Sequence, residues 1–298
     1  MTASFRATAP TFIAPPGTTD CHMHIVGSPE RYPFAAGRTY ATIPASVDDY
    51  RAVMKSLGIA RTVIVQPSFY GTDNRCTLDA MRALGAAARG VAVIDPDIAE
   101  RDLEALHEAG CRGARLNIGS ALPSAEHALE AKLARLDDRV RNLGWHIQIF
   151  TLPALLPQIA AVQGKLRSTL VIDHFGMLRP EHAAVAPMRG YLDALLAILD
   201  GGGWVKLSGL YRMADDFFAP SLGALARTLY ARAPERAVWG SDWPHTPPHE
   251  RAVADEQQFL PFRDIDTGAL LSPVAQWFPD EATRKRVLVA NPARLYGF

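Results

Sequence analysis

The chain has 298 residues, of which 48% are hydrophobic and 21% are charged, and its 31 lysines and arginines balance its 31 aspartates and glutamates. These values are typical of a soluble globular protein with a large core, and the balanced charge argues against a nucleic-acid partner. The N-terminal segment 1–17 lacks the apolar run of a secretory signal, and no stretch has the length of a membrane span. Three widely spaced cysteines argue against a disulfide scaffold, so we expect a cytoplasmic protein.

Short apolar runs rich in β-branched residues alternate with amphipathic segments along the chain. We predict strands at 19–25, 62–67, 91–95, 112–117, 146–150, 169–174, 204–208 and 237–242. We predict helices within 46–58, 100–110, 128–144, 153–166, 188–202 and 220–233. The first of these helices begins with an S-x-x-D pair, Ser46 and Asp49, and ends at Gly58.

Eight strands that alternate with helices predict parallel pairing through right-handed crossovers. The number of strands favours an α/β fold, with residues 1–298 forming a single (β/α)8 TIM barrel domain. Within this domain, residues 1–17 form an irregular N-terminal segment. The main rival is a doubly wound open sheet. That fold usually carries a glycine-rich phosphate loop after an early strand, and the sequence has none.

The first strand, in "TTDCHMHIVG", carries polar residues at alternate positions. Asp20, His22 and His24 are each two residues apart, so strict alternation predicts that they share one face of the strand. Cys21 is then expected on the opposite face. A strand covered on both faces would make the polar face a site, whereas a solvent-facing strand would carry the same histidines incidentally.

Polar residues also stand near the carboxyl ends of most other predicted strands, which meet at one mouth of a barrel. They are Ser68, Arg115, Asn117, Asp173, His174, Tyr211, Arg212 and Asp242. Asp242 is suited to act as a general base that takes a proton from water. Histidines polarise a carbonyl directly or through a metal, and arginine forks suit a carboxylate. The common theme is attack by water on an activated carbonyl in an acidic substrate.

The motifs "DCHMH", "IDHFG", "WVKLSG", "VWGSDWPH" and "NPARLYGF" together resemble the amidohydrolase superfamily. The resembling branch contains the 2-pyrone-4,6-dicarboxylate lactonases, sugar-acid lactonases and a galactarolactone isomerase. The resemblance implies a barrel that hydrolyses a lactone in bacterial catabolism. It implies Asp242 as the base for water and His22, His24 and His174 around the lactone carbonyl. It also implies four substrate contacts, from Tyr40, Ser68, Arg115 and Arg212.

The chain departs from that branch at two arginines, where it has Ala121 and Met177, and at a tyrosine absent from "HIQIF". Fewer guanidinium groups would leave a dicarboxylate poorly paired, and unpaired buried charge is costly. We therefore expect a smaller or less anionic substrate, such as a muconolactone-like or sugar-acid lactone.

We expect no metal or other cofactor. Metal-dependent amidohydrolases usually add a lysine on the fourth strand or a histidine on the fifth. Here the fourth strand has no lysine and the fifth ends in Phe150. The less favoured alternative is a divalent metal, Zn²⁺ or Mn²⁺, held by His22, His24 and Asp242.

Three other functions stay open at this point. A metal-dependent decarboxylase of the same superfamily and a lactone isomerase would use much of the same site. A binding barrel without catalysis would need no base such as Asp242, so the Asp242→Asn variant separates binding from turnover. The exact lactone and the oligomeric state are not set by the sequence.

Overall fold

The structure is a computed structural model that describes residues 5–118, 129–180, 186–247 and 259–298. Ala121 lies outside the described residues. Eight strands form one parallel sheet in the order β1-β3-β4-β5-β6-β7-β8-β9. They are β1 Thr19–Met23, β3 Arg61–Val65, β4 Ala88–Ala92, β5 Cys111–Asn117, β6 His146–Phe150, β7 Leu170–Ile172, β8 Trp204–Ser208 and β9 Ala237–Gly240. A short parallel pair, β2 Ala41–Thr42 and β10 Phe259–Leu260, stands apart from the sheet.

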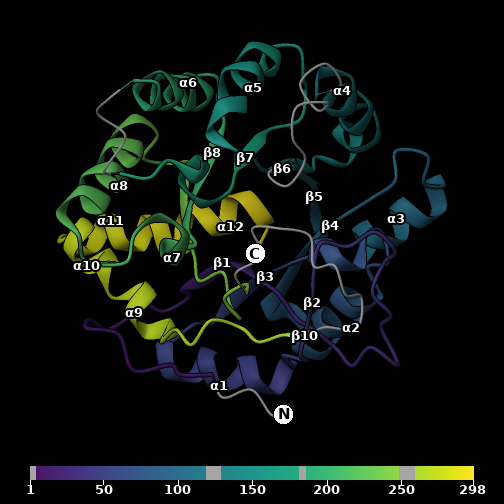
Figure 1. The fold of residues 1–298 in the computed structure, drawn as a ribbon, viewed down its shortest axis with the longest axis horizontal. Coiled ribbons are helices and arrows are strands. Elements are labelled where there is room, and N and C mark those ends of the chain that lie inside the picture. The colour runs from purple at the N-terminus through teal and green to yellow at the C-terminus, as the bar shows by residue number, and fades with distance from the viewer. Residues whose placement is uncertain (1–4, 119–128, 181–185, 248–258) are drawn as a thin grey trace.

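Helices surround the strands as a ring, except that α7 and α12 lie inside this ring in the view of Figure 1. They are α1 Val47–Leu57, α2 Arg75–Leu84, α3 Glu100–Glu108, α4 Leu129–Val140, α5 Leu156–Gln163, α6 Met188–Asp200, α7 Leu210–Met213, α8 Pro220–Arg232, α9 Thr267–Leu271, α10 Pro273–Trp277, α11 Glu281–Lys285 and α12 Asn291–Tyr296. Among the described residues, no helix has both the length and the apolar character to cross a membrane.

The sheet closes on itself where its first and last strands meet. The Asp242 amide donates to the His22 carbonyl oxygen at 2.7 Å, and the His24 amide donates to the Trp243 carbonyl oxygen at 2.8 Å. Met23 and Trp243 form a parallel bridge across the same seam. The predicted (β/α)8 TIM barrel is therefore confirmed.

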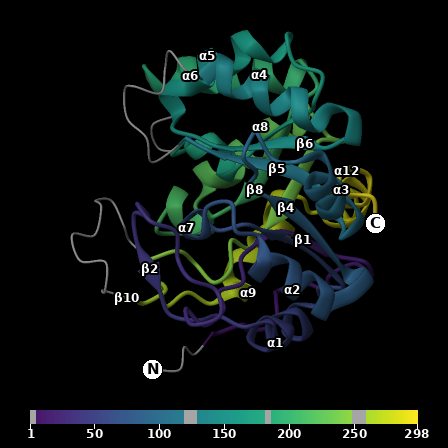
Figure 2. The ribbon, with the colours of Figure 1, turned by 90° about the vertical axis from the view of Figure 1, so that its right-hand side faces the viewer.

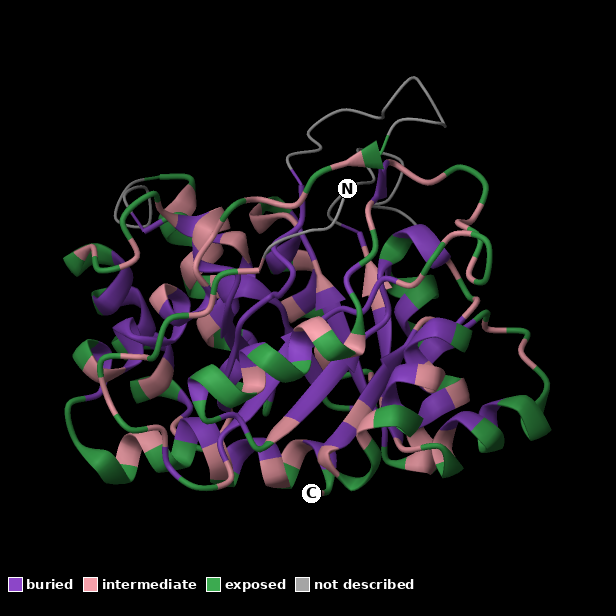
Figure 3. Cartoon of the chain, turned by 90° about the horizontal axis from the view of Figure 1, so that it is seen from below, coloured by how far each residue is buried: buried purple, intermediate pink, exposed green. Residues whose placement is uncertain are grey.

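The core has two layers on either side of the barrel wall. The larger layer lies between strands and helices, and Figure 3 shows the strands mostly buried behind helices whose outer faces are exposed. The inner layer fills the barrel and draws side chains from strands on all sides: Cys21, Val63, Val65, Val91, Val171, Trp204, Val238 and Tyr296. Tyr296 belongs to α12, which lies with the C-terminus on the side of the barrel away from α7 and β2 (Figure 2).

Local sequence explains most element boundaries. Helix α1 begins with the predicted capping box between Ser46 and Asp49 and ends at Gly58, whose left-handed φ of 69° suits glycine. Strand β4 begins three residues before the predicted 91–95 run, because pairing with β3 recruits Ala88–Gly90, which have low strand propensity. The predicted helices omit α2, although its buried residues Cys76, Thr77, Ala80 and Met81 recur at helical spacing. They also omit the short helices after β9, which span too few turns to show a pattern.

Strict alternation fails in β1. The pairing of β1 with β3 shifts register between Asp20 and Met23, as at a β-bulge. Asp20 points outward and accepts a hydrogen bond from Tyr50 of α1 at 2.9 Å. Cys21 packs in the inner layer of the barrel, where His22 approaches Asp173. The predictions that Asp20 shares the histidine face and that Cys21 lies opposite the histidines are therefore wrong.

Candidate active site

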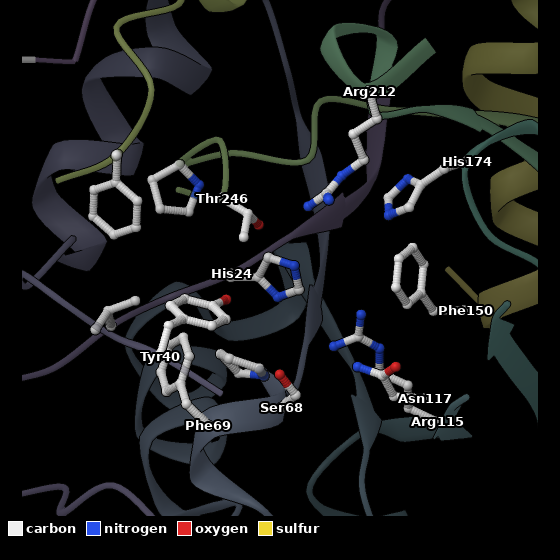
Figure 4. Close-up of a pocket in the computed structure, with 14 residues that line it drawn as sticks. His24, Tyr40, Ser68, Phe69, Arg115, Asn117, Phe150, His174, Arg212 and Thr246 are labelled. Carbon is white, nitrogen blue, oxygen red and sulfur yellow. The ribbon is translucent and has the colours of Figure 1, made fainter. Parts of the chain in front are cut away.

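A pocket opens at the carboxyl ends of the strands, on the same side as α7 (Figures 2 and 4). Six of the eight predicted site residues line it: His24, Tyr40, Ser68, Arg115, His174 and Arg212. The other two, His22 and Asp242, are fully buried and lie against His24 and His174, outside the lining. Further lining residues include Asn117 and Phe150. The structure thus brings all eight predicted residues into one cluster.

Asp242 is anchored through one carboxylate oxygen only. Its Oδ2 accepts from the Tyr211 hydroxyl at 2.6 Å and from Arg212 Nε at 2.9 Å. Its Oδ1 is buried and has no hydrogen-bond partner among the described residues. Burial disfavours the charged form, but Arg212 and the neighbouring histidines outweigh it and hold the pKa of Asp242 well below its usual value. Asp242 is therefore an ionised carboxylate at neutral pH, with one oxygen available to accept a proton.

The histidine rings are oriented by partners on their Nδ1 side. His24 Nδ1 lies 2.7 Å from the Val65 carbonyl oxygen, and a carbonyl only accepts, so this nitrogen carries a hydrogen. The other ring nitrogen of His24, Nε2, lies 3.4 Å from Asp242 Oδ1. His22 Nδ1 lies 3.3 Å from Asp173 Oδ1, and His22 Nε2 lies 3.6 Å from Asp242 Oδ1. The Lys206 ammonium also lies 3.5 Å from His22 Nδ1, so the proton of neutral His22 faces either Asp173 or Asp242.

Burial keeps two of the site histidines neutral. It lowers the pKa of His22 well below the usual value, against the opposing charge of Asp173. It also lowers the pKa of His174 to about 4. His174 Nδ1 lies 2.8 Å from the Ser208 hydroxyl. Because a neutral imidazole has one donor and one acceptor, the proton of His174 faces either Ser208 or the pocket.

The converging acceptors fit a divalent cation. His22, His24 and Asp242 each offer a ligand atom, and all three atoms lie within 4.8 Å of one another. His24 Nδ1 donates its hydrogen to a backbone carbonyl, and His22 Nδ1 lies 3.3 Å from the Asp173 carboxylate; contacts of this kind are the usual support of metal-bound histidines. Three such ligands with an open position are typical of catalytic zinc. The donor set therefore suits Zn²⁺ or Mn²⁺ as well as a hydrogen-bonded water.

The buried Lys206 of β8 stands behind the histidines and has no role in the sequence prediction. Its ammonium donates to Gln148 Oε1 at 2.6 Å and to the Cys21 carbonyl oxygen at 2.7 Å, and lies 3.8 Å from Asp173 Oδ1. Gln148 in turn donates to Asp173 Oδ2 at 3.1 Å. Burial lowers the pKa of Lys206 to about 8, so it stays mostly protonated at neutral pH. This ring of contacts fixes the Asp173 carboxylate beside His22.

The two predicted arginines differ in how many of their N–H groups are already bound within the protein. Arg115 is 9% exposed, donates to the Gln66 carbonyl oxygen at 2.8 Å, and forms no salt bridge among the described residues. Arg212 binds Asp242 through Nε, so only its two terminal nitrogens can contact a ligand. Tyr40 is buried, and burial raises its pKa to about 12, so its hydroxyl stays protonated. Met177, which stands where the resembling branch has an arginine, does not line the pocket.

Comparison with known proteins gives a consistent match over the whole barrel. Residues 19–298 match the family described as Amidohydrolase. The chain is 34% identical to a 4-sulfomuconolactone hydrolase of Rhizobium radiobacter, covering 98% of this chain and 94% of that protein. It is 34% identical to a D-galactarolactone isomerase of Agrobacterium fabrum, covering 99% and 96%. It is 30% identical to a 2-pyrone-4,6-dicarboxylate hydrolase of Comamonas testosteroni, covering 96% and 92%.

Proposed function

The chain belongs to the amidohydrolase family, and we propose that it is a lactonase that opens a carboxylate-bearing lactone with water activated by Asp242. One observation carries the proposal: an ionised aspartate with a single free oxygen lies against a pocket whose walls hold two arginines and two histidines. Its similarity to lactone hydrolases over nearly its whole length supports the same reaction class. The similarity to bacterial lactone hydrolases supports a catabolic role, and the three free, buried cysteines fit a reducing compartment such as the cytoplasm.

The pocket favours an anionic substrate. Arg115 and the terminal nitrogens of Arg212 are suited to a carboxylate, because a guanidinium binds both of its oxygens. Tyr40 and Ser68 also line the pocket, and their hydroxyls are suited to contacts with ring oxygens (Figure 4). A carboxylate held in this way directs the lactone carbonyl toward His174.

The reaction proceeds in two balanced steps. Asp242 Oδ1 accepts a proton from water, and the water oxygen attacks the carbonyl carbon to give a tetrahedral oxyanion. With the Ser208 hydroxyl donating to Nδ1, His174 carries its proton on Nε2 and stabilises this oxyanion together with Arg212. The intermediate collapses, the ring carbon–oxygen bond breaks, and the ring oxygen receives the proton from Asp242. The product is a hydroxy acid with one more carboxylate.

A metal would be held by His22, His24 and Asp242, and when bound it would supply Lewis-acid polarisation and a more acidic water. That the enzyme needs no metal stays a prediction. Elemental analysis of protein purified without added metal, with activity measured before and after chelation, tests it. Activity that survives chelation in metal-free protein supports the prediction. One bound ion per chain with activity lost on chelation contradicts it and favours the decarboxylase alternative.

Hydrolysis is tested with a panel of pyrone, muconolactone and aldonolactone acids in H₂¹⁸O. A lactonase places one ¹⁸O atom in the new carboxylate. Asp242→Asn is expected to lower turnover about 10²- to 10⁴-fold while substrate still binds. Asp264→Asn, at an exposed carboxylate paired with Arg6, is the matched control and should leave turnover unchanged. Full activity of Asp242→Asn on every lactone of the panel would rule out the assigned base.

A lactone isomerase is the second candidate, favoured by the similarity to a D-galactarolactone isomerase over 99% of this chain. An internal hydroxyl would then attack the carbonyl in place of water, with the same base and the same carbonyl contacts. The two reactions differ in the isotope experiment, because isomerisation gives a product of unchanged mass and no ¹⁸O.

A further inference from the structure

The Tyr211 hydroxyl stands in a directed chain of hydrogen bonds that ends on Asp242. The Thr246 amide donates to Tyr211 Oη at 3.0 Å, and Tyr211 Oη lies 2.6 Å from Asp242 Oδ2. An amide only donates and an ionised carboxylate only accepts, so the hydroxyl hydrogen must point to Asp242. Every hydrogen bond of this series is therefore donated in the same direction, from the Thr246 backbone at the pocket edge toward the Asp242 carboxylate.

These hydrogen bonds make the two carboxylate oxygens of Asp242 unequal. Oδ2 receives two donors, the Tyr211 hydroxyl and Arg212 Nε at 2.9 Å, whereas Oδ1 receives none from the described residues. Two charge-assisted hydrogen bonds to one oxygen fix the carboxylate plane and stabilise negative charge on that oxygen. Oδ1 is left as the oxygen that faces His22 and His24 and is free to take a proton.

We propose that Tyr211 is a positioning residue that, with Arg212, selects Asp242 Oδ1 as the proton acceptor. Through its hydroxyl, Tyr211 also connects the Asp242 carboxylate to Thr246 at the edge of the pocket. This inference rests on the proposed function, because it assigns a geometry to the base of that reaction. Thr246 lines the pocket, so the chain connects a wall that contacts substrate with the group that activates water.

The rest of the Tyr211 side chain is held by contacts that do not involve the hydroxyl. His245 meets the ring edge-on at a centroid distance of 5.7 Å, and the Arg263 guanidinium lies 5.5 Å from the ring centroid. The Arg212 guanidinium lies 5.1 Å from the same centroid. Phenylalanine at this position keeps all three contacts and removes only the hydrogen bonds.

Tyr211→Phe is therefore the direct test. We expect kcat to fall about 10- to 100-fold with KM within about twofold of the parent value, because a hydrogen bond to a charged group is lost at the base and not at the substrate. Tyr230→Phe is the matched control, since the Tyr230 hydroxyl contacts Thr283 and Arg286 away from the pocket. Thermal melting of both variants confirms that they are folded.

A double variant separates positioning from a structural role. If Tyr211 acts through Asp242, then adding Tyr211→Phe to Asp242→Asn lowers the residual turnover no further. An unchanged kcat in Tyr211→Phe, or a raised KM with unchanged kcat, would overturn the inference. A further fall in the double variant equal to that in the single variant would do the same. Full activity of Asp242→Asn would instead overturn the base assignment of the proposed function, so the two failures are distinguishable.

Discussion

Asp20 holds together the seam of the barrel, and its removal should destabilise the fold by a calculable amount. Its Oδ1 accepts from the backbone amides of His22 at 3.1 Å and Ser241 at 2.9 Å. Its Oδ2 accepts from the hydroxyls of Tyr50 at 2.9 Å and Ser241 at 2.5 Å. One fully buried side chain thereby links β1, α1 and the end of β9.

Asp20→Ala leaves two buried backbone amides without an acceptor. Each unsatisfied donor costs about 1–3 kcal/mol, so we expect a loss of about 2–6 kcal/mol in the free energy of unfolding. Asp20→Asn keeps one carbonyl oxygen for both amides, and the Tyr50 and Ser241 hydroxyls can turn to accept from its NH₂ group. It also removes a carboxyl whose pKa is raised by burial. We expect Asp20→Asn to cost less than about 2 kcal/mol.

The assay is equilibrium urea unfolding followed by the fluorescence of the buried tryptophans, with refolding used to establish reversibility. Asp264→Asn, at an exposed aspartate, serves as the control and should lie within about 0.5 kcal/mol of the parent protein. A loss below about 1 kcal/mol for Asp20→Ala would refute the reasoning, because the amides would then have other partners. Equal losses for Ala and Asn would show that the charge, and not the acceptors, matters.

Three further predictions concern the interior charges. Lys206→Met should lower the free energy of unfolding in urea by about 3–5 kcal/mol, because it leaves the Asp173 carboxylate buried without its cation. Adding Asp173→Asn to this variant should recover much of the lost stability. Additive losses from the two substitutions would contradict this prediction. Burial lowers the pKa of His174 and His245 to about 4 and of His146 to about 3. The unfolded chain, with histidine pKa values near about 6.5, takes up protons first, so stability should be full above about pH 6.5 and fall steadily toward about pH 4; equal urea midpoints at pH 7.5 and 5 would contradict this. Arg115→Gln should raise KM at least about tenfold for a lactone acid but not for its neutral methyl ester, and equal effects on both would argue against carboxylate binding.

Much of the barrel and the site could be predicted from the sequence, because both follow from local patterns. The strand runs are rich in β-branched and apolar residues and polar residues stand near their carboxyl ends, so His24, Arg115, His174 and Asp242 converge once the barrel closes. The capping box of α1 likewise depends on two residues close together in the sequence, Ser46 and Asp49.

The remainder depends on partners far away in the chain. The outward turn of Asp20 follows from a register shift against β3, which β1 alone does not encode. The protonated state of Lys206 in an apolar barrel depends on Asp173, which lies on a loop after a different strand. The link from Tyr211 to Asp242 depends on α7, which has only four residues and no periodicity of its own.

The seam between β1 and β9 also bears on when during synthesis the protein becomes active. His22 and His24 leave the ribosome first, and Asp242 emerges more than 200 residues later. The site therefore does not exist on the nascent chain until the last strand has been made and has docked beside the first. If Asp242 is the base of the proposed reaction, every product of premature termination before β9 lacks that base, whatever part of the barrel it has already folded.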